Sequence, residues 1–72
     1  MERAEKINLF EEILDLELGT LSESTLLVDI EEFDSMSKLS LIVLMDDEFG
    51  KKLTGEQLRE FKTVADVIDF MG

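Results

Sequence analysis

The sequence predicts an all-α protein, a four-helix bundle with a long first loop and a short third helix. Three observations support this fold class. Apolar residues recur three or four positions apart, no segment shows the sustained alternation typical of a strand, and no proline interrupts the chain. The 72 residues, 44% of them hydrophobic, suit one small domain, 1–72. Because cysteine and histidine are absent, helix packing must supply its stability.

The first predicted helix runs from Glu2 to Leu18, and Gly19 is a natural stop. Its apolar residues form one stripe at helical spacing: Ile7, Phe10, Ile13, Leu14 and Leu18. Residues 20–34 lose this pattern and contain serines and threonines that favour turns. We expect an ordered loop there, held in place by Leu26 and Ile30. A connection of this length in so small a domain is uncommon and often functional.

The second predicted helix runs from Ser35 to Phe49, with Asp34 or Ser35 as its N-cap and Gly50 at its end. We expect its core-facing stripe to be Met36, Leu39, Ile42, Val43 and Phe49. Three further apolar residues, Leu41, Leu44 and Met45, widen this surface beyond one packing face. A helix that is apolar on most sides is central to its fold or offers a second face to a partner.

Two capping signals predict the remaining helices. Thr54 is followed three residues later by Gln57, a capping box that opens a short third helix extending to about Phe61. Thr63 is the expected N-cap of a fourth helix. The apolar residues of that helix share one face: Val64, Val67, Ile68 and Met71.

The composition excludes several functions. A net charge of −11 repels nucleic acid and anionic membrane surfaces but attracts basic protein patches. The longest apolar run, residues 41–45, is far too short to span a bilayer. We therefore expect a soluble, cytoplasmic, monomeric protein that binds neither nucleic acid nor membrane.

Enzyme chemistry is also disfavoured. No histidine is present to activate a serine, and the spacing of Ser35 and Lys38 matches a serine acyl-enzyme motif only in isolation. The acidic pair Asp46 and Asp47 lacks the ligand spacing of a calcium loop. The sequence predicts a non-catalytic protein with no dedicated metal site.

Several motifs resemble the acyl carrier proteins, a family of small acidic four-helix bundles. Asp34-Ser35-Met36 stands where the family carries Asp-Ser-Leu at the start of its second helix. Residues 46–50 (Asp-Asp-Glu-Phe-Gly) and 61–66 (Phe-Lys-Thr-Val-Ala-Asp) continue the match. The resemblance covers essentially the whole chain, with the first helix and long loop matched by pattern only.

The resemblance implies that Ser35 is the attachment point of 4′-phosphopantetheine, which a separate phosphopantetheinyl transferase takes from coenzyme A. The thiol of this arm would hold an acyl group as a thioester and present it to partner enzymes. The alternative role of Ser35 is that of a helix cap, which Asp34 could fill equally well. Asp34 would act as this cap or help to position the transferase and the phosphate.

The resemblance further implies that the second helix recognises partners. Met36 and Leu41 are candidates for partial exposure and apolar docking, and Asp46 and Asp47 for pairing with basic groups on acyl- or aminoacyl-transferring enzymes. We expect Leu39, Val43 and Phe49 to belong to the core, part of which could open for an acyl chain.

Three departures from typical fatty-acid carriers indicate a specialised, stand-alone carrier. Such carriers have a glycine two residues before the motif, whereas here Glu32 and the bulky aromatic Phe33 precede Asp34. Ser40 stands where many of them have an acidic residue, and Lys38 adds a positive charge beside the attachment site. A D-alanyl or aminoacyl carrier with dedicated partners is therefore one alternative. An unmodified acidic adaptor that binds a basic protein through the second helix is another.

Overall fold

In the computed structural model, which describes residues 2–72, the chain forms four α-helices and one turn of 3₁₀ helix. These elements are α1 (Arg3–Ile13), η1 (Leu27–Asp29), α2 (Ser35–Phe49), α3 (Gly55–Glu60) and α4 (Val64–Met71). No strand occurs in the described part of the chain, where a single isolated bridge joins Leu26 to Thr63. The predicted fold class, an all-α four-helix bundle with a long first loop and a short third helix, is confirmed.

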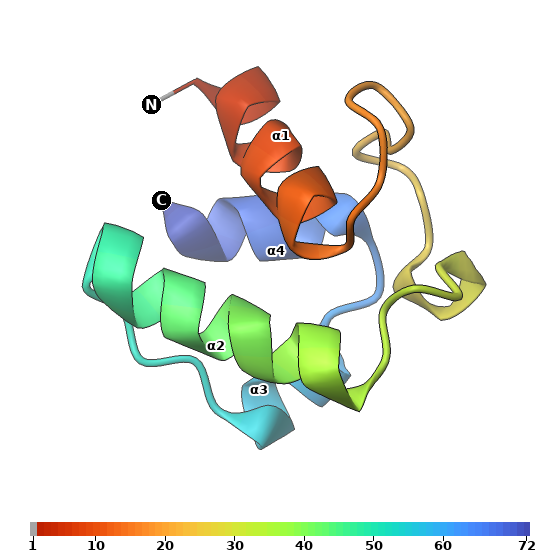
Figure 1. Ribbon diagram of the computed structural model, residues 1–72. Helices are drawn as coiled ribbons and strands as arrows, with labels where there is room; N and C mark the ends of the chain where they lie inside the picture. Colours follow the sequence, from red (N-terminus) through yellow and green to blue (C-terminus); the bar gives the residue numbers. More distant parts are fainter. Residues whose placement is uncertain (1) are drawn as a thin grey trace.

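Helix α1 contacts both α2 and α4, and α4 lies between the other long helices in Figure 1. The short α3 lies beside α2, at the end of the molecule away from α1 (Figure 1). Hydrophobic side chains from every helix, from the long loop and from the link between α2 and α3 form the core, with one aromatic ring among them. The buried hydrophobic residues are Phe10, Leu14, Leu21, Leu27, Ile30, Leu41, Met45, Leu53, Leu58, Val64, Val67, Ile68 and Met71.

The predicted end of α1 at Leu18 is wrong, because the helix stops at Ile13. Asp15 adopts the left-handed conformation with φ 58°, which terminates a right-handed helix. The fully buried Glu11 carboxylate accepts hydrogen bonds from the backbone N–H groups of Gly19 (3.2 Å) and Leu21 (2.8 Å). These bonds fold the following residues back against the helix and leave Leu18 64% exposed, outside the predicted stripe.

The long loop is ordered by backbone hydrogen bonds to the start of α4. Leu27 N–H donates to the Lys62 carbonyl, and Val64 N–H donates to the Thr25 carbonyl, both at 2.9 Å. Ile30 is buried as predicted, but Leu26 is 45% exposed and the buried anchor beside it is Leu27. In this bridge-forming segment the side chains alternate, so pairing at Leu26 turns the next residue inward.

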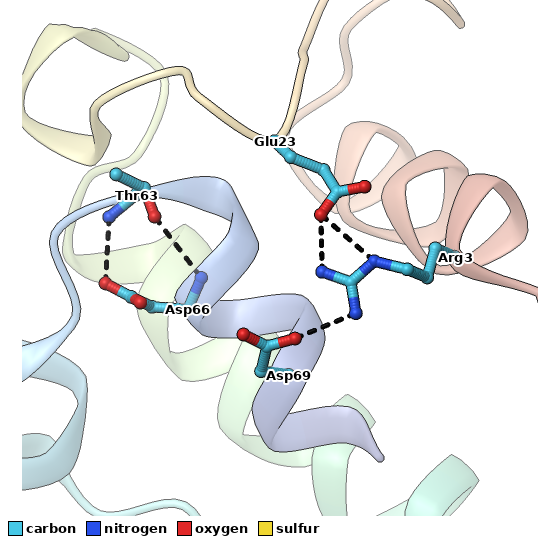
Figure 2. Close-up of polar contacts among 5 residues, drawn as sticks. All are labelled: Arg3, Glu23, Thr63, Asp66 and Asp69. Carbon is cyan, nitrogen blue, oxygen red and sulfur yellow. Dashed lines mark hydrogen bonds and ion pairs between the residues drawn. The ribbon is translucent and has the colours of Figure 1, made fainter.

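Arg3 links three parts of the chain that are distant in sequence. Its guanidinium donates hydrogen bonds to Glu23 in the loop and to Asp69 in α4, the latter at 2.8 Å. Figure 2 shows this side chain placed between the two carboxylates. The two pairings raise the pKa of Arg3 above its ordinary value, with the Glu23 hydrogen bond as the larger cause. All three groups are exposed, so this link adds little to stability in salt solution.

The boundaries of α2, α3 and α4 agree with the sequence prediction. Gly50 ends α2 in the left-handed conformation, with φ 62°, which a glycine adopts without strain. Capping boxes open both later helices, Thr54 with Gln57 and Thr63 with Asp66. Among residues 2–72, no helix combines the length and apolarity that a membrane crossing requires.

The predicted core face of α2 is wrong. Leu41 and Met45 are fully buried, whereas Met36, Leu39 and Val43 are 77%, 64% and 57% exposed. Both sets lie at helical spacing, so periodicity alone did not distinguish them. The packing of α1 against α2 decides which of the two apolar faces turns inward. Ile42 and Phe49, also predicted for the core, pack partly buried against its edge.

Candidate functional site

Ser35 is the first residue of α2, and its side chain is exposed to solvent. Within residues 2–72, its hydroxyl takes part in none of the side-chain hydrogen bonds, which near this position involve Asp34, Ser37 and Glu32. The Ser35 oxygen is therefore exposed to solvent, and it makes no side-chain hydrogen bond to the described residues. A hydroxyl in this state can be reached from solvent.

Asp34 is the N-cap of α2. Its backbone is extended, with φ −93° and ψ −172°, and its carboxylate accepts a 2.9 Å hydrogen bond from the N–H of Ser37. This hydrogen bond is the main cause that holds the pKa of Asp34 below its ordinary value. Of the two candidate caps, the structure thus uses Asp34, and the Ser35 side chain caps nothing in the described part of the chain. The adjacent positive end of a fifteen-residue helix is a favourable place for a phosphate group.

Ser37 holds the preceding loop against the first turn of α2. Its hydroxyl donates a 2.8 Å hydrogen bond to the carbonyl of Glu32. Phe33, the residue that departs from the family pattern, packs edge-on against Phe10 with ring centres 5.4 Å apart. The ammonium of Lys38 lies 5.5 Å from the centre of the Phe33 ring. Phe33 therefore anchors the loop segment that precedes Ser35 to the core.

A groove of about 740 Å³ begins beside Ser35 and lies between α2, α3 and the long loop. Its walls are mainly apolar, and two cations, Lys38 and Arg59, line it as well. The groove is open to solvent where Ser35 and Leu39 are exposed. A volume of this size is within the range of small-molecule pockets.

The other predicted recognition residues have mixed outcomes. Met36 is exposed as expected, and Asp46 and Asp47 are exposed near the far end of α2. Leu41 is fully buried, so the prediction that it docks with partners is wrong, because its face packs into the bundle. Exposed apolar side chains occur instead at Leu39 and Val43.

A signal in the sequence could have identified Leu39 and Val43. Residues four apart on a helix share a face, and a serine predicted to be a modification site should lie on the solvent-exposed face. Ser35, Leu39 and Val43 are spaced four apart, and Asp46 and Asp47 continue the same row. The position of Ser35 therefore indicates that Leu39 and Val43 lie on the exposed face of the helix, although apolar periodicity had assigned them to the core.

The fold and this site define a small acidic four-helix domain with an accessible serine at a helix start. A protein-family model described as "Phosphopantetheine attachment site" matches residues 7–71. The chain belongs to the acyl carrier protein family, whose members are carrier proteins with covalently attached 4′-phosphopantetheine. The free hydroxyl at the positive end of α2 fits this group.

Curated relatives agree with this assignment. An acyl carrier protein of Thermobifida fusca is 30% identical over 63 residues, covering 88% of this chain and 80% of the relative. One from Myxococcus xanthus is 38% identical over 40 residues, which cover 56% of this chain and 51%, about half, of the relative. A meromycolate extension acyl carrier protein of Mycobacterium leprae is 29% identical over 63 residues, covering 88% of this chain and 55% of the relative. No solved structure matches significantly.

Proposed function

We propose that residues 1–72 act as a single non-catalytic carrier domain that holds acyl or aminoacyl groups as thioesters on a 4′-phosphopantetheine arm attached to Ser35. One observation carries this proposal: the exposed Ser35 hydroxyl makes no side-chain hydrogen bond within residues 2–72, while its neighbour Asp34 caps the helix. The family assignment supplies the identity of the arm, and the free serine at the start of α2 supports the position of attachment.

The chain's own contribution to attachment is to present an oxygen. The Ser35 oxygen would bond to the phosphorus of coenzyme A that bears the pantetheine, as the pyrophosphate bond breaks and adenosine 3′,5′-bisphosphate leaves. The transferase accepts the hydroxyl proton, because the carrier has no histidine for this task. The N–H groups at the start of α2 then favour the phosphodiester charge. The thiol at the end of the arm supplies the thioester chemistry.

The exposed stripe of α2 is the proposed docking surface for partners. Met36, Leu39 and Val43 offer apolar contacts next to Ser35. The exposed Asp46 and Asp47 would pair with basic groups on the partner and give fast, salt-sensitive association. The aromatic anchor at Phe33 and the positive charge of Lys38 favour a dedicated set of partners over general fatty-acid enzymes.

Intact-mass measurement tests the attachment. The purified chain is incubated with coenzyme A, magnesium and a promiscuous phosphopantetheinyl transferase. We expect the mass of one arm to be added to the wild type and to Ser40→Ala, whose exposed serine also lies on α2. Ser35→Ala should gain nothing. An unmodified wild type would favour the acidic-adaptor alternative, and a modified Ser35→Ala would move the attachment to another residue.

A further inference from the structure

The groove beside Ser35 has a charge opposite to that of the molecule. Its apolar walls include Leu27, Ile30, Phe33, Ile42, Leu58 and Phe61. Lys38 and Arg59 are the charged residues that line it, and no carboxylate does so. In a chain with 18 acidic and 7 basic residues, this local composition stands apart from the rest of the surface.

Neither cation of the groove has an anionic partner among residues 2–72. Within residues 2–72, both ion pairs are made by Arg3, which does not line the groove. Lys38 lies over the Phe33 ring, a contact that leaves its N–H groups available to a ligand. Arg59 lies in the last turn of α3, where any positive charge is favourable. A lysine would meet that need, so the helix terminus alone does not explain the planar guanidinium.

The two cations lie on different walls of the groove. Lys38 follows Ser35 by three residues in α2, so the two side chains are neighbours on the helix surface. A phosphodiester on Ser35 would therefore have its counterion in the same helical turn. Arg59 belongs to α3 (Gly55–Glu60), on the other side of the groove. Its fork of donors suits a second anion, and a carboxylate accepts two parallel hydrogen bonds from it.

We propose that the groove holds a short acyl group that ends in a carboxylate, with Lys38 beside the phosphodiester and Arg59 bound to the distal carboxylate. This inference rests on the proposed attachment at Ser35. The flexible arm folds back along the groove, and the apolar walls cover the methylene groups of the acyl chain. Arg59 binds the carboxylate at the end of that chain. A neutral acyl group of the same length keeps only the apolar contact.

Two amide-linked cargoes of equal carbon number, glutaryl and pentanoyl, test this specificity, since the amide resists hydrolysis. Each is loaded with the transferase, and the melting temperature is compared with that of the chain bearing the bare arm. We expect the glutaryl form to melt about 4 °C or more above the pentanoyl form. This result would be diagnostic, because one more negative charge on an already anionic chain otherwise lowers the melting temperature.

Variants assign the effect to its residue. Arg59→Gln should abolish the difference between glutaryl and pentanoyl forms, and the Arg59 Nε–H resonance should shift in the glutaryl form alone. Lys52→Gln, an exposed lysine that does not line the groove, should preserve the difference. Lys38→Gln should lower the melting temperature of all forms that bear the arm by a similar amount.

Two results would overturn the inference while leaving the carrier function intact. One is equal melting temperatures for the two cargoes. The other is an equal change in melting temperature on Arg59→Gln for the bare, pentanoyl and glutaryl arms. That result would indicate that Arg59 binds the phosphodiester and not the distal carboxylate. A chain that gains no arm at all, seen by intact mass, would instead contradict the proposed function and this inference with it.

Discussion

Two neighbouring residues at the start of α2 have separate tasks. Asp34 accepts the Ser37 N–H and begins the helix, while the Ser35 hydroxyl makes no hydrogen bond within the described chain. The division follows from geometry, because an N-cap side chain folds back toward the N–H groups two or three residues on. The side chain of the first helical residue projects outward. The helix therefore keeps its N-cap, Asp34, while the serine beside it stays accessible.

This division predicts effects of different size for two alanine variants. Ser35→Ala should change the free energy of unfolding by less than about 0.5 kcal/mol, as for an ordinary surface substitution. Asp34→Ala should destabilise the protein clearly more, because the Ser37 N–H loses its acceptor. Urea unfolding followed by circular dichroism measures both. A larger loss for Ser35→Ala than for Asp34→Ala would assign the capping role to Ser35.

Asp66 gives the protein a defined sensitivity to acid. Hydrogen bonds from the N–H groups of Lys62 (2.8 Å) and Thr63 (3.2 Å) hold the pKa of this carboxyl below its ordinary value of 3.8. Figure 2 shows Asp66 and Thr63 capping one another at the start of α4. Because the folded pKa is the lower one, the stabilisation is complete above the unfolded pKa and disappears as pH falls through the folded pKa.

The matched variant Asp66→Asn keeps an oxygen acceptor but does not titrate. We expect it to be less stable than the wild type at neutral pH, because neutral acceptors bind N–H groups more weakly. The difference in unfolding free energy should stay constant above about pH 5 and shrink below about pH 4. Urea titrations across this range measure it. A difference independent of pH would mean that the carboxylate charge contributes nothing to the cap.

At the scale of elements, α2 shows how a helix with two apolar faces is placed. Leu41 and Met45 enter the core, while Leu39 and Val43 remain exposed in the same helix. Both faces would satisfy a periodicity argument. Packing against the neighbouring helices determines which apolar face of α2 is buried. The other face remains as an exposed apolar stripe next to Ser35 that a partner can cover.

Two leucines two positions apart provide a matched test of this orientation. Leu41→Ala should destabilise the protein by about 2–5 kcal/mol, since it removes a fully buried side chain. Leu39→Ala should lie within about 0.5 kcal/mol of the wild type and should slow modification by the transferase if the stripe docks partners. Urea unfolding and the rate of mass gain measure these effects. Similar losses of stability at both positions would contradict the orientation.

At the scale of the whole molecule, charge opposes folding. A net charge of −11 is held within a body measuring 26 × 25 × 19 Å, so most carboxylates repel one another across distances that low salt does not screen. The two ion pairs in the described chain, both exposed and both made by Arg3, offset little of this repulsion.

Salt should therefore stabilise the protein. Raising potassium chloride from about 0.01 M to about 0.5 M shortens the screening length from roughly 30 Å to a few Å. We expect the melting temperature to rise by roughly 4–8 °C, the shift that a gain of about 1 kcal/mol gives a domain of this size. Chloride is used because sulfate also strengthens apolar burial. A fall in melting temperature would show that ion pairs outweigh repulsion.

Much of the fold could be predicted from local chemistry. The bounds of α2, α3 and α4 follow from Asp34, Thr54 and Thr63 as caps and from Gly50 as a stop. Each of these signals acts on backbone groups within a few residues. The end of α1 did not follow, because Glu11 binds N–H groups eight and ten residues further on.

By itself, the sequence determined the helix boundaries that capping controls, the acidity of the molecule and the place of Ser35 at the head of α2. Only the tertiary structure decided that Leu41 faces inward and Leu39 outward, and that Lys38 and Arg59 line one groove. The physical reason is range. Caps and turns join neighbours along the chain, whereas burial and the lining of a groove depend on which distant segments pack together.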